Sequence, residues 1–91
     1  MYYEMHITMK GDKTLIKKYT EMYGWKFSAI DGDPTLGDGV KCYATFQYNS
    51  KYYINEAIDL LNATAKELKS HNVVILRRKI ELVMYDEIDA D

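Results

Sequence analysis

"YYEMHITMK", residues 2–10, alternates between apolar and polar side chains from its second tyrosine onward. The apolar positions are Tyr3, Met5, Ile7 and Met9, and the polar positions are Glu4, His6, Thr8 and Lys10. This period of two predicts a β-strand that buries one face and leaves the other open. His6 and Thr8 are therefore expected on the open face.

Hydrophobic periodicity predicts five further elements. A helix is predicted between Asp12, its N-cap, and Gly24, which ends it. Its apolar stripe at helical spacing consists of Leu15, Ile16, Tyr19, Met22 and Tyr23. The remaining elements are a strand over 25–30, a strand over 40–48, a helix over 55–69 and a strand within 72–85.

The order strand, helix, strand, strand, helix, strand is typical of a ferredoxin-like α+β sandwich. In that fold a four-stranded antiparallel sheet carries both helices on one face, and the first and third strands are central. We expect residues 1–91 to form one domain with an acidic C-terminal tail over 86–91.

The last predicted strand is interrupted. Val74, Leu76, Ile80, Leu82 and Met84 are expected on one side, but Arg78 falls among them. A β-bulge near Arg77 and Arg78 would explain the interruption.

Polar residues of three neighbouring strands are expected to meet on the open face. They are Glu4, His6 and Thr8 of the first strand, Lys41, Tyr43 and Thr45 of the third, and Arg77, Lys79 and Glu81 of the last. This group of cations and hydroxyls around an imidazole suits a phosphate or carboxylate ligand. Three interpretations stay open: a purely structural face, an interaction or oligomer face, and a ligand or catalytic site.

Composition narrows the classes of function. The formal charge of −2 does not favour binding to duplex nucleic acid. A single cysteine excludes an intrachain disulfide. Because the chain has only two histidines besides this cysteine, we do not expect a zinc site of ordinary spacing. We expect no cofactor. We expect a cytoplasmic protein with no membrane span, with Cys42 as a buried, inert thiol and His71 exposed at a helix end.

The stretch "DGDPTLGDG", residues 31–39, is predicted to be a glycine-assisted connection between strands. A calcium loop needs glycine at its sixth position and glutamate at its twelfth, where Leu36 and Cys42 stand. A phosphate loop needs lysine and a hydroxyl residue after its second glycine, where Asp38 and Gly39 stand. Neither motif is present.

The stretch "MHITM", residues 5–9, resembles one half of the signature of the two-histidine phosphoesterases. The resemblance implies that His6 acts as acid or base on a cyclic or linear phosphodiester and that Thr8 holds a phosphate oxygen. This chain departs from the pattern at His71, which stands in "SHNVV" without the second threonine. Its length is also about half of what the family usually has.

The combination of "MHITM", "GWKFSAIDGDPTLGDGVKCYAT" and "KIELVMYD" resembles a group of small phage-type proteins with no established activity. That resemblance implies a viral accessory factor in the host cytoplasm.

Two functions follow from these observations. The first is a binding module whose open face holds a phosphate-bearing ligand such as a nucleotide, or a host protein, and a homodimer is one form that this module could take. The second is a phosphodiesterase in which two chains each contribute His6 and Thr8 to one site.

Overall fold

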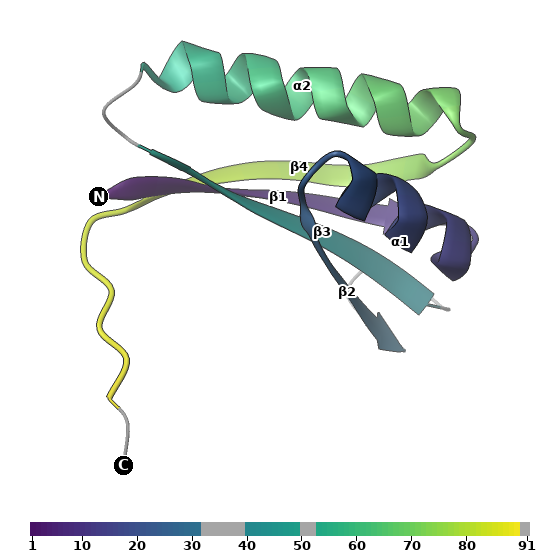
Figure 1. Ribbon diagram of the computed structural model, residues 1–91, viewed down its shortest axis with the longest axis horizontal. Coiled ribbons are helices and arrows are strands. Elements are labelled where there is room, and N and C mark those ends of the chain that lie inside the picture. Colours follow the sequence, from purple (N-terminus) through teal and green to yellow (C-terminus); the bar gives the residue numbers. More distant parts are fainter. Residues whose placement is uncertain (32–39, 50–52, 90–91) are drawn as a thin grey trace.

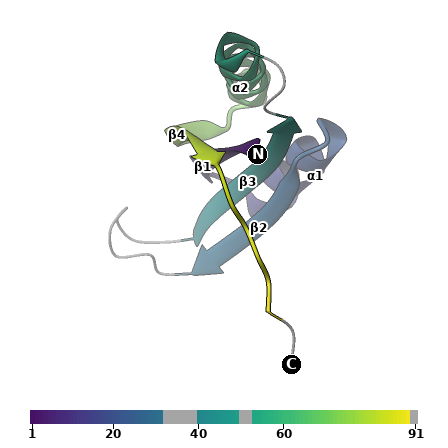
Figure 2. The same cartoon turned by 90° about the vertical axis from the view of Figure 1, so that its left-hand side faces the viewer.

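The computed structural model describes residues 1–31, 40–49 and 53–89, apart from the side chains of residues 30, 31 and 40. Its elements are β1 (Tyr2–Lys10), α1 (Lys13–Met22), β2 (Lys26–Asp31), β3 (Val40–Asn49), α2 (Ile54–Ser70) and β4 (Val74–Val83). The strands form one antiparallel sheet in the order β2-β3-β1-β4. Both helices cover the same face of that sheet (Figures 1 and 2). The predicted ferredoxin-like sandwich is confirmed.

The core lies between the helices and the inner face of β1. Met5, Ile7 and Met9 are each 0% exposed, so the alternation of β1 has the predicted sense. Strand β3 and the helices complete the core with Ala44, Cys42, Ile16, Ala57, Leu61 and Leu68, and Trp25 joins them from just before β2. Burying an aliphatic or methionine side chain contributes roughly 1.5–3 kcal/mol, so these three residues of β1 hold the sheet firmly against the helices.

Helix α1 begins and ends at the predicted residues. The Asp12 carboxylate accepts a hydrogen bond from the backbone N–H of Leu15 at 3.0 Å, which caps the first turn. Gly24 follows the last turn with a φ of +85°, a conformation that glycine adopts without strain. The buried face of α1 is narrower than predicted, because Leu15 and Met22 are exposed. The fully buried residues of this helix are Ile16 and Thr20.

The end of α2 differs from the expectation for His71. Its ring stacks on Tyr19 of α1 with ring centroids 3.8 Å apart and an interplanar angle of 7°. The Nε2 atom also lies 3.4 Å from the hydroxyl of Tyr23. His71 is therefore half-buried and joins the two helices, whereas the sequence alone predicted an exposed side chain.

Strand β4 contains the predicted irregularity. Thr8 of β1 pairs with Arg77, but the next residue of β1 pairs with Ile75, so Leu76 is an extra residue on β4. This bulge lies one residue before the predicted position. It reverses the alternation of β4, so that Ile75 and Ile80 both pack on the core while Leu76 is 40% exposed.

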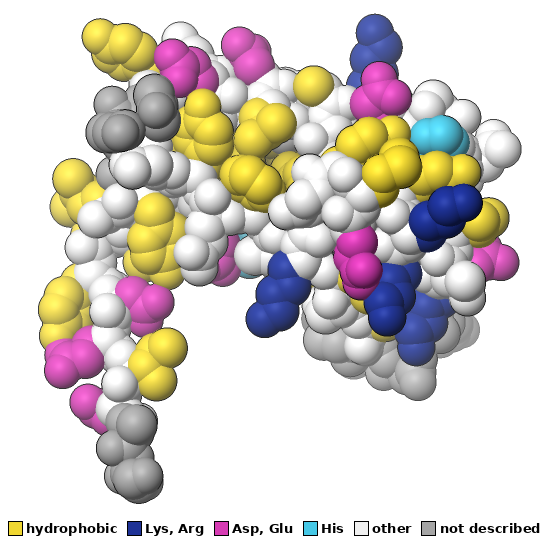
Figure 3. All heavy atoms as spheres, in the orientation of Figure 1, with side chains coloured by type: hydrophobic (Ala, Val, Ile, Leu, Met, Phe, Trp, Pro, Cys, Tyr) yellow, Lys and Arg dark blue, Asp and Glu magenta, His cyan; other side chains and the backbone are white. Residues whose placement is uncertain are grey.

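Beyond β4 the chain leaves the body of the molecule. Residues 84–89 form neither helix nor strand, and the hydroxyl of Tyr2 donates a hydrogen bond to Asp86 at 3.0 Å. Figure 3 shows hydrophobic side chains both below α2 and along this tail. In the tail these are Met84, Tyr85 and Ile88, all highly exposed.

The burial of Cys42 generates a test of the core. Its side chain is 0% exposed, and burial raises the pKa of its thiol. We expect the native protein to react with a disulfide reagent far more slowly than the same protein unfolded in guanidinium, because thiolate formation requires the core to open. Reaction of the native chain at the rate of the unfolded chain would contradict this packing.

Candidate functional site

The register of the sheet brings the predicted open-face residues together. On one side of β1, His6 pairs with Lys79 and Thr8 pairs with Arg77 of β4. On the other side, His6 pairs with Thr45 and Thr8 with Tyr43 of β3. Directly opposite residues of neighbouring strands point to the same face, so these side chains form adjacent rows on the face without helices.

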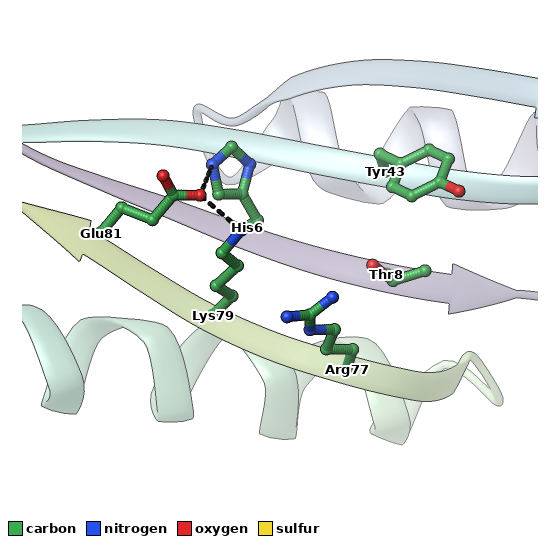
Figure 4. Close-up of a pocket in the computed structure, with 6 residues that line it drawn as sticks. All are labelled: His6, Thr8, Tyr43, Arg77, Lys79 and Glu81. Atoms are coloured by element: carbon green, nitrogen blue, oxygen red, sulfur yellow. Dashed lines mark ion pairs between the residues drawn. The ribbon is translucent and has the colours of Figure 1, made fainter. Parts of the chain in front are cut away.

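These rows surround a shallow pocket of about 190 Å³ at the centre of the open face (Figure 4). Its lining residues are His6, Thr8, Tyr43, Arg77, Lys79 and Glu81. All six belong to the set that the alternation pattern predicted. Of the other predicted ligand-binding residues, Thr45 contacts the imidazole of His6 without lining the pocket, and Lys41 lies farther along β3.

The imidazole of His6 is held by side chains of the same sheet. Its Nε2 atom lies 2.9 Å from a carboxylate oxygen of Glu4 and 3.6 Å from one of Glu81. Its Nδ1 atom lies 3.2 Å from the hydroxyl of Thr45. Both ring nitrogens therefore already have partners within the chain, which fixes the plane of the ring.

One end of the pocket contains a close ion pair. The Nζ atom of Lys79 lies 2.7 Å from a carboxylate oxygen of Glu81. Through this hydrogen bond and its charge, Lys79 lowers the pKa of the Glu81 carboxyl, and His6 and Arg77 act in the same direction. This end of the pocket therefore presents the carboxylate of Glu81, whose oxygens accept hydrogen bonds.

The other end of the pocket is cationic. The Arg77 side chain extends from β4 across the sheet toward β1 (Figure 4). Among the residues that the structure describes, neither the Arg77 guanidinium nor the Thr8 hydroxyl forms an ion pair or a side-chain hydrogen bond. These donors and the ring of Tyr43 lie around the same hollow.

Lys41 occupies a different environment from the one predicted for a ligand-binding residue. Its side chain is only 1% exposed, and it does not line the pocket. It lies two residues before Tyr43 on β3, which is about 7 Å farther from the centre of the site along the strand. Sequence alternation assigns a residue to a face, but it does not reveal how much of that residue is exposed.

Three residues of this surface were not among those predicted to bind a ligand, although Glu4 was already expected on the open face. Glu4 contacts the imidazole of His6, as two side chains two positions apart on one strand face can do. Lys26 and Ser28 of β2 extend the open face, because they pair with Thr45 and Tyr43. Their alternation with Trp25 and Phe27 was the signal that could have identified them.

Other kinds of site receive no support. Within the described ranges, no group of three or more histidine, cysteine, aspartate or glutamate residues is arranged to hold a metal ion. No helix in the described parts of the chain has the length and apolar character needed to cross a membrane. The predictions for the segment 32–39 lie outside the described residues.

No family model, curated protein or solved structure matches this chain. The resemblances to the two-histidine phosphoesterases and to the small phage-type proteins therefore stay predictions.

The ion pair at the pocket generates a test of its geometry. Replacing Lys79 by alanine is expected to raise the pKa of Glu81 toward the ordinary value for glutamate, as followed by carboxyl NMR during an acid titration. Because the pair lowers this pKa in the folded state, its contribution to stability is present above the ordinary pKa and is lost as the pH falls through the lowered one. Lys66→Ala on α2 serves as the control, and an unchanged Glu81 pKa in Lys79→Ala would refute the pairing.

Proposed function

We propose that the protein is a small binding module whose open-face pocket holds the phosphate group of a small ligand such as a nucleotide. The observation that supports this most directly is the cationic end of the pocket. There the Arg77 guanidinium and the Thr8 hydroxyl line a concave surface without a side-chain partner among the described residues. Guanidinium groups bind phosphate oxygens through paired, charge-assisted hydrogen bonds, and a hydroxyl adds a further donor.

The two ends of the pocket also define the polarity of the ligand. Arg77 would attract the anionic group, whereas Glu81 would accept hydrogen bonds from a hydroxyl or amino group. A sugar phosphate carries both features within a short distance. The structure thus favours a phosphate joined to a hydroxyl-bearing or amino-bearing group over a simple inorganic anion.

The size of the pocket limits how much of the ligand it encloses. Pockets that bury a drug-sized molecule have volumes of about 300–1,000 Å³. The hollow of about 190 Å³ is smaller, so it suits a phosphate and the group attached to it. The rest of a nucleotide would lie on the open sheet beside Tyr43.

Binding is favoured over catalysis because of the contacts of His6. A general acid or base needs a ring nitrogen within hydrogen-bond reach of the transferred proton. In this chain Glu4 and Thr45 already contact the two nitrogens of the ring. His6 is therefore better suited to positioning its neighbours than to exchanging protons with a substrate.

A matched pair of arginine variants tests the proposed function. Arg77→Ala is expected to weaken binding of adenosine monophosphate about 10- to 100-fold by calorimetry, since a hydrogen bond to a charged group contributes roughly 1.5–3 kcal/mol. Arg78→Ala removes the same charge from the next residue, whose side chain instead donates to Asn62 of α2 at 2.9 Å, and it is expected to bind like the wild type.

Adenosine without its phosphate is the ligand control, and it is expected not to bind measurably. Equal losses in the two arginine variants, or equal affinity for adenosine and its monophosphate, would contradict phosphate recognition by Arg77.

A further inference from the structure

Strand β4 forms an outer edge of the sheet, as the strand order and Figure 2 show. Within the described parts of the chain, no strand pairs with the side of β4 that faces away from β1. An edge strand of this length presents backbone N–H and C=O groups that can pair with a further strand.

The bulge determines which part of this edge is regular. After the extra residue Leu76, β4 continues without a register shift from Arg77 to Val83, and the midpoint of that stretch is Ile80. We propose that two copies of this chain pair antiparallel along β4 about a two-fold axis at Ile80, joining their sheets into one.

The charges of β4 are complementary to themselves in this register. With Ile80 opposite Ile80 of the partner subunit, Lys79 of each copy lies opposite Glu81 of the partner subunit. Lys79 and Glu81 both project from the open face, so the pairing forms two cross-strand ion pairs on one surface.

Each of the two neighbouring registers places like charges directly opposite one another, although an axis at Lys79 would also set Arg77 opposite Glu81 of the partner subunit. An axis at Lys79 would place two lysines opposite each other, and an axis at Glu81 would place two glutamates opposite each other. Like charges directly opposite across a strand pair are destabilising. Of these three registers, only the one centred on Ile80 pairs opposite charges without also pairing like charges, so the sequence of β4 favours it.

An exposed apolar strip lies beside the same edge on the helix side. The hydrogen bond from Arg78 to Asn62 shows that this flank of α2 faces β4. Ile58 and Ile54 lie one and two helical turns before Asn62, so they share its flank. They are 37% and 49% exposed, and Leu82 of β4 is 50% exposed. A partner related by the axis at Ile80 would cover these side chains.

The dimer would also place both pockets on one side of the joined sheet. Lys79 of the partner subunit would lie next to Glu81 at the rim of each pocket. The second copy thus adds a cation to the site, although the dimer itself does not depend on the identity of the ligand.

Sedimentation equilibrium combined with a charge exchange tests the dimer. The wild type is expected to show twice the chain mass of 10.6 kDa and to dissociate on dilution. Lys79→Glu alone and Glu81→Lys alone are each expected to be folded by circular dichroism and monomeric, because each sets like charges opposite one another. An equimolar mixture of the two variants is expected to recover the dimer mass, with one copy of each variant.

Ile58→Lys is a second variant that leaves the ion pair intact, and it is expected to be monomeric. A wild type that stays monomeric at all concentrations would overturn the dimer and leave the edge for a different partner. A mixture of the two charge variants that stays monomeric, or single variants that dimerise like the wild type, would overturn the register centred on Ile80.

Discussion

Burial of alternate side chains of β1 beneath the two helices is the constraint on which the rest of the structure depends. Met5, Ile7 and Met9 have no exposed surface. Their burial contributes several kcal/mol in total, which is comparable with the whole stability of about 5–15 kcal/mol that small domains have. A slip of one residue would expose all three, so the register of the central strand is strongly determined. Glu4, His6 and Thr8 are consequently held on the open face.

The bulge at Leu76 extends this constraint to the edge of the sheet. It allows Ile75 and Ile80 to pack on the core although they are an odd number of residues apart. As a result, Arg77 and Lys79 face the pocket beside Thr8 and His6. The same bulge limits the regular edge of β4 to the stretch centred on Ile80. It therefore affects both the residues that line the pocket and the strand edge along which we propose that two copies pair.

Much of the fold and the site could be predicted from the sequence because they depend on local alternation. Period-two patterns in β1 and β3 identify the faces, and the order of elements then identifies the neighbours of each strand. The stacking of His71 on Tyr19 and the burial of Lys41 could not be predicted in this way. The stacking joins residues far apart in the chain, and neither feature leaves a periodic trace in the sequence.

The contacts of His6 show a similar limit. A histidine-threonine pair on a strand matches half of a catalytic signature, but the pattern does not show whether the imidazole has other partners. In the folded chain Glu4 and Thr45 contact its two ring nitrogens. The alternation pattern thus locates the residues of this surface, and the folded structure shows which of them contact one another.

Amide NMR spectra recorded while adenosine monophosphate is added to the wild-type protein would test the open-face pocket most directly. We expect the largest saturable shifts at Thr8, Tyr43 and Arg77, with little change along α1 and α2. No saturable shifts at these residues, or shifts confined to the helices, would contradict a phosphate site on the uncovered face of the sheet.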